Sequence, residues 1–382
     1  MGIKQPSLSF YNYKTGKIQK DIWSELETGL WQEYLIDNQI SNNSIGPTRI
    51  TLWKPVFKNI TPIYPGTIWN SNKMELQEDL FYPSIKEISR DDFYSLCEAF
   101  FTSYREKHIA VHLSGGLDSS IIIGLLNYFK IPFSLIGLTS NRFEFRTERR
   151  IQEILGILGT KTVLINMDDY PFYSKLSQIQ VHQIPEDNIT GNHSQSAIAE
   201  VCNKLGVEVV FSGQGGDTIF VNEIPSEPYT WSCNIGNEFQ FPWEQDVLYP
   251  AYNVKLVSFY SDKAIIEALY NLRLGQGTDV LKRWARQYFK HILPIELVDY
   301  TYCADFFGLS LDGLQKAKPE IEVLFQKAYK LVGHPIFSPS ATTKLLKTDF
   351  LSLEYKTYTD LCNRLSIAVW YNSLVNGNII KA

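Results

Sequence analysis

The fold is decided by the stretch Val111-His112-Leu113-Ser114-Gly115-Gly116-Leu117-Asp118-Ser119-Ser120. An apolar run over residues 108–113 predicts a buried strand before the glycines. Residues 118–129 predict a helix, and the Asp-Ser-Ser at its start is expected to cap the first turn with side-chain acceptors. A strand, a glycine loop and a helix N-terminus form an anion cradle. A carboxylate at the edge of such a cradle indicates Mg²⁺ shared with phosphates.

A bare Gly-Gly is typical of an ordinary strand-to-helix turn, which is the alternative here. The complete S-G-G-L-D-S-S pattern after an apolar strand favours phosphate binding instead. It is not the Walker pattern, because no Gly-Lys-Ser/Thr follows. The residues expected at this phosphate site are Leu113, Ser114, Gly115, Gly116, Leu117, Asp118, Ser119 and Ser120.

Composition excludes several classes of protein. The 382 residues carry a net charge of −5, and no basic stripe indicates nucleic-acid binding. No apolar run is long enough to span a membrane. The five cysteines are dispersed without a Cys-x-x-Cys pair, which argues against a zinc or redox site and favours reduced thiols in the cytoplasm.

The Ser114–Ser120 loop resembles the pyrophosphate-binding loop of the N-type ATP pyrophosphatases, which cut ATP between its α and β phosphates and adenylate a substrate. A second stretch, Val209-Val210-Phe211-Ser212-Gly213-Gln214-Gly215-Gly216-Asp217-Thr218-Ile219-Phe220, resembles the S-G-E-G-(A/G)-D-E-L-F segment of the asparagine synthetase family. The resemblance implies ATP and Mg²⁺ as cofactors, with Asp118 and Asp217 as metal ligands. Gln214 and Thr218 depart from it, because the family usually has Glu at both positions.

The same resemblance implies a nucleotide site that extends beyond the first loop. Its further members are Ser212, Gly213, Gln214, Gly215 and Gly216 in the second glycine loop, and Ile136 and Gly137 in the predicted second strand, against which the family places adenine.

Strands and helices alternate through the middle of the chain, and this order predicts an α/β fold. Strands are expected at 108–113, 133–139, 161–167 and 207–212, separated by helices at 118–129, 145–158 and 194–205. We expect a parallel Rossmann-like sheet, similar to that of adenine nucleotide alpha hydrolases, with helices on both faces. Both glycine loops then lie at the carboxyl edge of the sheet.

The chain is predicted to form two domains. Residues 1–85 are predicted to form a β-rich module that resembles a truncated glutaminase domain. Residues 86–382 are predicted to form the synthetase domain. Gly2 follows Met1 where a glutaminase has its catalytic cysteine, so no glutamine hydrolysis is expected. A small β-rich cap or docking module is the alternative. From about residue 225 helices are expected at 264–274, 279–289, 314–331 and 355–375, forming a helical half.

The segment after Leu293-Pro294 departs from the family, which usually places an Arg and a Lys there, facing the adenylate and pyrophosphate. Developing negative charge needs a cation, and the nearby candidates are Lys282, Arg283 and Arg286. For Lys282 the alternative is a solvated charge on a helix. Tyr300 and Tyr302 are candidate proton relays for an incoming amine, or else partly buried aromatics. His112 is expected to be a packed core side chain.

The sequence therefore predicts an ATP-dependent enzyme that adenylates a carboxylate for attack by an amine. Residues 222–228 resemble lasso-peptide cyclases, so a macrolactam-forming cyclase acting on a peptide is the specific expectation, with a leader peptidase or leader-binding protein as partner. A ligase acting on a small carboxylate, asparagine-like or β-lactam-forming, is the first alternative. A relative that binds nucleotide or peptide without turnover is the second.

Overall fold

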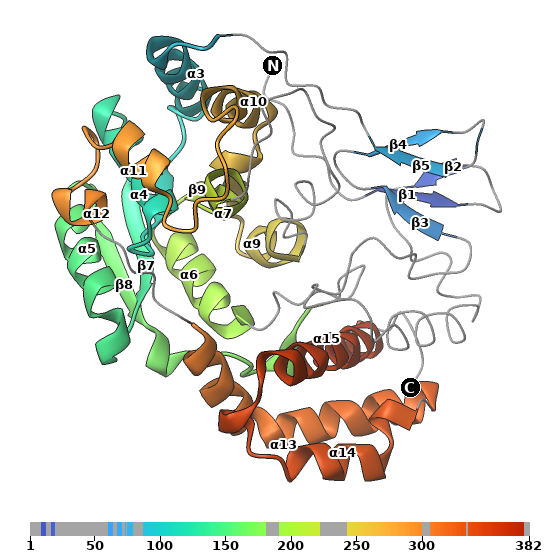
Figure 1. Cartoon of the computed structure of the whole chain (residues 1–382). Helices are drawn as coiled ribbons and strands as arrows, with labels where there is room; N and C mark the ends of the chain where they lie inside the picture. The colour runs from blue at the N-terminus through green and yellow to red at the C-terminus, as the bar shows by residue number, and fades with distance from the viewer. Residues whose placement is uncertain are drawn as a thin grey trace.

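The computed structural model describes residues 87–180, 191–221, 243–299, 306–333 and 335–377, together with five short N-terminal strands and Lys73. At its centre lies a five-stranded parallel sheet (Figure 1). Its strands are β6 (Ile109–His112), β7 (Ser134–Thr139), β8 (Thr162–Asn166), β9 (Val209–Ser212) and β10 (Lys255–Ser258).

The spatial order of these strands is β10-β9-β6-β7-β8, and every neighbouring pair is parallel. The chain builds outward from β6 through β7 and β8, and then adds β9 and β10 on the other side of β6. The winding direction therefore reverses between β6 and β9. In doubly wound sheets this reversal opens a crevice at the carboxyl ends of the strands, and both glycine loops leave their strands at this point.

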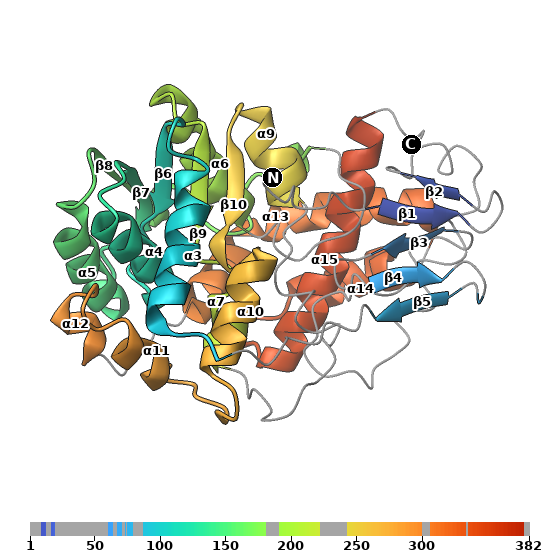
Figure 2. The ribbon, with the colours of Figure 1, turned by 90° about the horizontal axis from the view of Figure 1, so that it is seen from above.

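Two layers of helices cover the sheet, and the strands contribute alternate residues to each layer. Val111 packs with the layer formed by α3 (Arg90–Thr102), α4 (Leu117–Tyr128), α5 (Arg146–Gly156) and α10 (Lys263–Leu272). Ala110 packs with the opposite layer, formed by α6 (Asn192–Lys204), α13 (Phe307–Val332) and α15 (Tyr355–Asn376). Figure 2 shows the sheet between these layers. The predicted fold, a parallel α/β sheet with helices on both faces, is confirmed.

Two predictions about elements were wrong. The fifth strand, β10, was missed because it lies beyond residue 225, in the part of the chain that was predicted to be a helical half. The helix expected at 279–289 begins only at Arg283, as α11 (Arg283–Tyr288), because Lys282 adopts a left-handed φ of 52°. Three other short helices connect the core elements: α7 (Gly216–Val221), α9 (Tyr249–Ala251) and α12 (Ile295–Val298).

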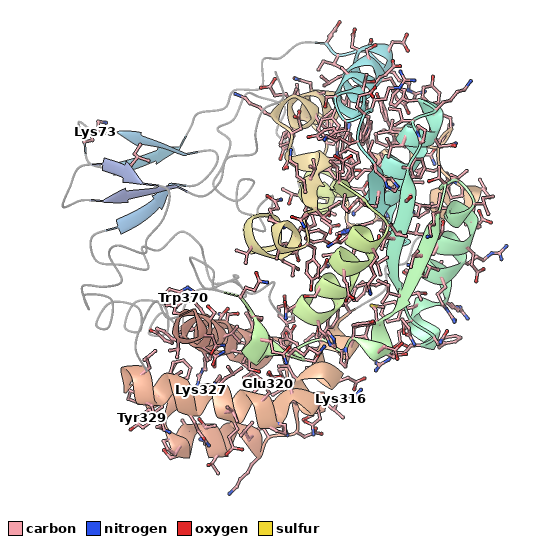
Figure 3. All side chains as sticks on the ribbon, turned by 180° about the vertical axis from the view of Figure 1, so that it is seen from behind. Lys73, Lys316, Glu320, Lys327, Tyr329 and Trp370 are labelled. Atoms are coloured by element: carbon pink, nitrogen blue, oxygen red, sulfur yellow. The ribbon has the colours of Figure 1, made fainter. Side chains whose placement is uncertain are left out.

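The C-terminal helices form a unit that is fastened to the loop after β8. Trp370 of α15 is fully buried, and Figure 3 shows it beside α13, which carries Lys316, Glu320, Lys327 and Tyr329. The Ser177 hydroxyl donates to Glu320 Oε1 at 2.6 Å, and Asn372 Nδ2 of α15 donates to the Ser177 carbonyl at 3.0 Å. The short α14 (Pro339–Leu346) packs on α13.

The N-terminal region contains short antiparallel strands, in agreement with the β-rich character expected there. A three-stranded sheet has the order β2-β1-β3, and a two-stranded sheet pairs β4 with β5. Their bounds are β1 (Ser9–Asn12), β2 (Lys17–Gln19), β3 (Ile60–Ile63), β4 (Thr67–Asn70) and β5 (Glu75–Glu78).

Candidate functional site

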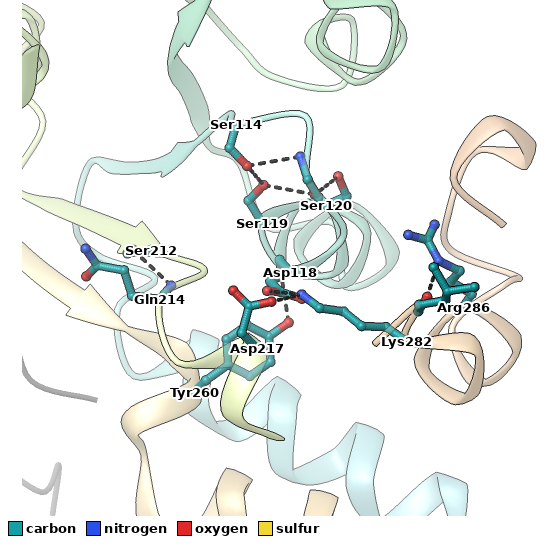
Figure 4. Close-up of polar contacts among 12 residues, drawn as sticks. Ser114, Asp118, Ser119, Ser120, Ser212, Gln214, Asp217, Tyr260, Lys282 and Arg286 are labelled. Carbon is teal, nitrogen blue, oxygen red and sulfur yellow. Dashed lines mark hydrogen bonds and ion pairs between the residues drawn. The ribbon is translucent and has the colours of Figure 1, made fainter. Parts of the chain in front are cut away.

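The first glycine loop is held closed by its own hydroxyls (Figure 4). Ser114 Oγ accepts a hydrogen bond from Gly116 N at 3.1 Å and lies 2.7 Å from Ser119 Oγ. The hydroxyls of Ser119 and Ser120 both donate to the Gly116 carbonyl. The expected capping was wrong, because Gly116 is the N-cap residue and no side chain caps α4. The N–H groups of the first turn are thus left for an anion.

The second glycine loop is tied to its neighbours instead. Ser258 Oγ of β10 donates to the Gln214 carbonyl at 2.6 Å. The Gln214 side chain extends away from Asp217 (Figure 4), and its Nε2 donates to Glu244 Oε2 at 2.8 Å. Glu244 is buried, and burial raises the pKa of its carboxyl to about 7, an effect that the hydrogen bond from Gln214 partly offsets.

Glycines in both loops permit close contact between backbones. Gly115 and Gly215 have φ of +82° and +86°, a region that residues with a Cβ rarely adopt. A Cβ on Gly213 would lie 2.7 Å from Ser119 N, and one on Gly216 would lie 2.5 Å from Asp118 Cγ. The second loop therefore needs Gly213 and Gly216 in order to pack against the first.

The two loops bring Asp118 and Asp217 to one cation, the ammonium of Lys282. Lys282 Nζ lies 2.7 and 2.8 Å from the two carboxylate oxygens of Asp118 and 2.5 Å from Asp217 Oδ1. The side chains of Lys282 and Asp118 are 13% and 14% exposed, whereas that of Asp217 is 80% exposed. The expected position of both aspartates at one edge is confirmed. Lys282 is neither helical nor solvated, contrary to the alternative for it.

Lys282 is anchored by the turn in which it lies. Its backbone N donates to the Asp279 carbonyl at 2.9 Å, and Asp279 N donates to the Val221 carbonyl at the end of α7. Arg286 Nε donates to the Leu281 carbonyl at 2.9 Å. The turn that carries Lys282 is thus fastened to the helix that follows the second glycine loop.

Burial and the charges of neighbouring groups oppose each other in this cluster. Burial raises the pKa of the Asp118 carboxyl, and the nearby Lys282 ammonium only partly offsets this shift. Burial also disfavours the charge on Lys282, but the carboxylates of Asp118 and Asp217 outweigh it and raise the pKa of the ammonium. Tyr260 holds the backbone of Asp118 in position, because its hydroxyl donates a hydrogen bond to the Asp118 backbone carbonyl at 2.9 Å.

A cavity of about 130 Å³ lies next to the first glycine loop, at the carboxyl ends of β6 and β7. Its lining includes Leu113, Ser114, Ile136 and Gly137, which were expected to contact a nucleotide. Phe145 and Phe306 add aromatic rings, with centroids 5.1 Å apart. The cavity can therefore receive a flat ring beside an anion cradle.

Several residues of this cavity were missed or misjudged. His112 is not simply a packed core side chain, because it lines the cavity and its Nε2 lies 2.8 Å from Tyr249 OH. Gln152, which nothing in its helical context marked, donates from Nε2 to the carbonyls of Leu113 and Leu138 and joins the ends of β6 and β7. Glu148 and Arg149 of α5 also line the cavity.

Other expected site residues lie elsewhere. Leu117 is the first residue of α4, and its side chain is buried in the core. Arg283 is exposed, and Arg286 is used to hold the turn around Leu281. Tyr300 and Tyr302 lie outside the described residues, so their proposed role as proton relays stays a prediction.

The two aspartates fit a magnesium ion whose coordination shell is completed by the phosphates of a ligand. Mg²⁺ is usually bound by one or two carboxylates together with substrate phosphates and water, and Asp118 and Asp217 already converge on one cation. Within the described parts of the chain, no cluster of three or more His, Cys, Asp or Glu side chains is placed to hold a metal. These residues therefore do not form a cage for a metal held by protein alone.

Comparison with known proteins defines the class of this chain. The family model for asparagine synthase matches residues 104–302, just over half of the chain, and the chain belongs to this family. Both glycine loops and Lys282 lie within the match. Among the helices that the structure describes, none combines the length and the apolar character needed to cross a membrane.

Individual relatives are distant. Amidase chyE of Penicillium rubens is 26% identical over 212 residues, which cover 46% of this chain and 31% of that protein. The chain thus matches about a third of the length of this curated relative. Among solved structures, the match to NMN synthetase from Francisella tularensis spans 70% of this chain and 98% of that chain, with 11% sequence identity and a TM-score of 0.34. The match to NAD⁺ synthetase from Burkholderia pseudomallei spans 55% of this chain and 93% of that chain, with 13% sequence identity and a TM-score of 0.28.

Proposed function

We propose that this protein is an ATP-dependent amide-forming ligase that adenylates a carboxylate and transfers the acyl group to an amine. The observation that carries the proposal is the Lys282 ammonium held between Asp118 and Asp217 beside the Ser114–Ser120 loop. Membership of the asparagine synthase family supports the same reaction class.

The reaction has two steps. A substrate carboxylate oxygen attacks the α-phosphorus of ATP, the bond from that phosphorus to the bridging oxygen breaks, and pyrophosphate leaves with the electron pair. The amine then attacks the acyl carbon, AMP leaves, and the amine loses a proton. A carboxylate is a poor electrophile, so adenylation gives it a good leaving group.

The residues of the site supply binding and charge. The first-turn N–H groups of α4 bind the phosphates that leave. With nucleotide bound, Asp118 and Asp217 would hold Mg²⁺, which would neutralise phosphate charge. In the same step Lys282 moves from the aspartates to the phosphate oxygens and stabilises the charge that develops there. It thereby takes the role of the basic residues absent after Leu293-Pro294.

For the substrate, we infer a peptide whose own amine closes a macrolactam, as in lasso-peptide maturation. The support is the resemblance of residues 222–228 to that group of cyclases. Intramolecular attack needs no separate source of ammonia. A small carboxylate with a separate amine is the alternative, and loss of one water from the peptide distinguishes the two by mass.

Formation of AMP and pyrophosphate from Mg·ATP with candidate peptides tests the reaction class. We expect Lys282→Met to lower AMP formation about 100-fold, because it removes a cation from a site of developing charge. Lys282→Arg should retain part of the activity. The control is Lys290→Met, which removes an exposed lysine from the same region and should leave turnover unchanged.

Thermal unfolding tests nucleotide binding without a known acceptor. A ligand at a hundred times its Kd stabilises the folded state by roughly 2.7 kcal/mol, so millimolar Mg·ATP should raise the Tm by several degrees. The shift should shrink in Asp118→Asn. If Mg·ATP shifts neither protein, the ATP-using reaction is wrong and a relative without turnover is the better account.

A further inference from the structure

Three polar side chains form a hydrogen-bonded chain beside the cavity. Tyr249 lies at its centre, with its hydroxyl 2.8 Å from His112 Nε2 and 3.0 Å from Gln195 Oε1. Tyr249 is fully buried, whereas His112 at the end of β6 and Gln195 on α6 both line the cavity. One phenol thus holds two cavity residues from different elements in a fixed relation.

The direction of the hydrogen bonds follows from the chemistry of the three groups. The amide oxygen of Gln195 can only accept, so Tyr249 donates its single proton to it. The Tyr249 oxygen then accepts from His112, which must carry its proton on Nε2. Burial keeps these states in place, because it raises the pKa of Tyr249 well above its usual value and lowers that of His112 to about 4.

This direction leaves one acceptor atom and one donor group for a ligand. His112 Nδ1 is an acceptor, and the Gln195 amide nitrogen has two N–H donors. Neither nitrogen has a hydrogen bond to another described residue. Adenine presents the complement, an exocyclic amino donor beside ring-nitrogen acceptors, whereas a 6-keto purine presents an oxygen at the same place.

We propose that His112 and Gln195 read the base of the nucleotide and select adenine over 6-keto purines. The adenine amino group donates to His112 Nδ1, and a neighbouring ring nitrogen accepts from the Gln195 amide. Tyr249 is a positioning residue that sets the polarity of both groups. This inference rests on the proposed use of ATP and adds a side-chain selection to the backbone contacts expected from β7.

The test compares the Kd of three nucleotides, ATP, ITP and purine riboside triphosphate, for the wild-type protein by calorimetry. Purine riboside triphosphate lacks the amino group and keeps the ring nitrogens, so it isolates the contact with His112. We expect ATP to bind at least about tenfold more tightly than ITP, with purine riboside triphosphate between them, because an unmatched polar group in a buried site is disfavoured. This comparison needs no variant.

Gln195→Glu sharpens the test. The new carboxylate still accepts from Tyr249 but offers an acceptor where Gln195 offered a donor, so the preference for ATP over ITP should fall about tenfold or reverse. Gln178→Glu makes the same change at an exposed site and should keep the wild-type preference. Tyr249→Phe should also lower the preference, because His112 then loses the acceptor that fixes its tautomer.

The outcomes separate this inference from the proposed function. Equal affinity for all three nucleotides would overturn base selection by His112 and Gln195 and leave the ligase proposal in place. A wild-type preference for ATP that survives in Gln195→Glu would assign the selection to the backbone instead. Binding of none of the nucleotides would reject both proposals.

Discussion

The two glycine loops share a sequence pattern but hold their acidic residues differently. Asp118, in the first loop, is buried and forms an ion pair with Lys282. Asp217, in the second, forms an ion pair with the same lysine but is largely exposed to solvent. The other buried acid near the second loop, Glu244, has only the neutral amide of Gln214 as a hydrogen-bond partner among the described residues. Burial raises the pKa of both carboxyls, and the two acids differ in what opposes this shift: the charge of Lys282 for Asp118, and a neutral hydrogen bond for Glu244.

The strongest way to break this contrast is to remove the shared cation. Lys282→Met leaves the Asp118 carboxylate buried beside Asp217 without its counter-ion, and we expect a loss of about 3 kcal/mol in the free energy of unfolding at pH 8. An acid with a raised pKa stabilises the folded state below its unfolded-state pKa and loses this contribution as the pH rises through the folded-state pKa. The loss should therefore be smaller at pH 5. Urea unfolding at both pH values measures it, with Lys290→Met as the control; equal losses at pH 5 and pH 8 would contradict this account.

The second prediction concerns the acid that lacks a cation. The folded-state pKa of Glu244 is raised to about 7 from 4.5, so its stabilising contribution is complete below pH 4.5 and is lost as the pH rises through 7. The full shift corresponds to about 3 kcal/mol. Glu244→Gln keeps an amide partner for Gln214 and removes the titration. We expect the variant to gain stability over wild type between pH 5 and pH 8, and parallel curves of unfolding free energy against pH would show that Glu244 is charged in the fold.

Local sequence patterns were sufficient to predict four of the five core strands and both glycine loops. Each apolar strand and its loop are adjacent in sequence, and parallel strands place such loops at one edge. The position of Lys282 was harder to predict, since it lies 164 residues from Asp118 and its side-chain direction depends on a left-handed turn. The position of His112 and Gln195 in the cavity was not predicted, because the two residues come from different elements and are linked only through Tyr249, which lies in a third. The departure at Gln214 is now explained in part by Glu244, which places a carboxyl beside it.

The third prediction concerns the packing between the loops. Gly216→Ala would place a Cβ 2.5 Å from Asp118 Cγ, so the two loops must separate. We expect a cost of about 2 kcal/mol in unfolding free energy, typical of overpacking, and a weaker contact between Asp118 and Lys282. Gly277→Ala is the matched control, because a Cβ there meets nothing within 4 Å and its φ is not in the left-handed region. If the two variants unfold at the same urea concentration, the loops are not tightly packed.

The smallest effect on stability is expected at Asp217, where function and stability should separate. Its side chain is 80% exposed, and exposed ion pairs contribute about 1 kcal/mol or less, so Asp217→Asn should hardly change the urea midpoint. Asp118→Asn should cost more, because the buried ammonium of Lys282 then loses its buried counter-ion. Both variants should nevertheless lower AMP formation about 100-fold, since both carboxylates are needed around the charge of the phosphates. If Asp217→Asn forms AMP at the wild-type rate, Asp217 is an ordinary surface charge without a role in the reaction. The first glycine loop alone would then define the site.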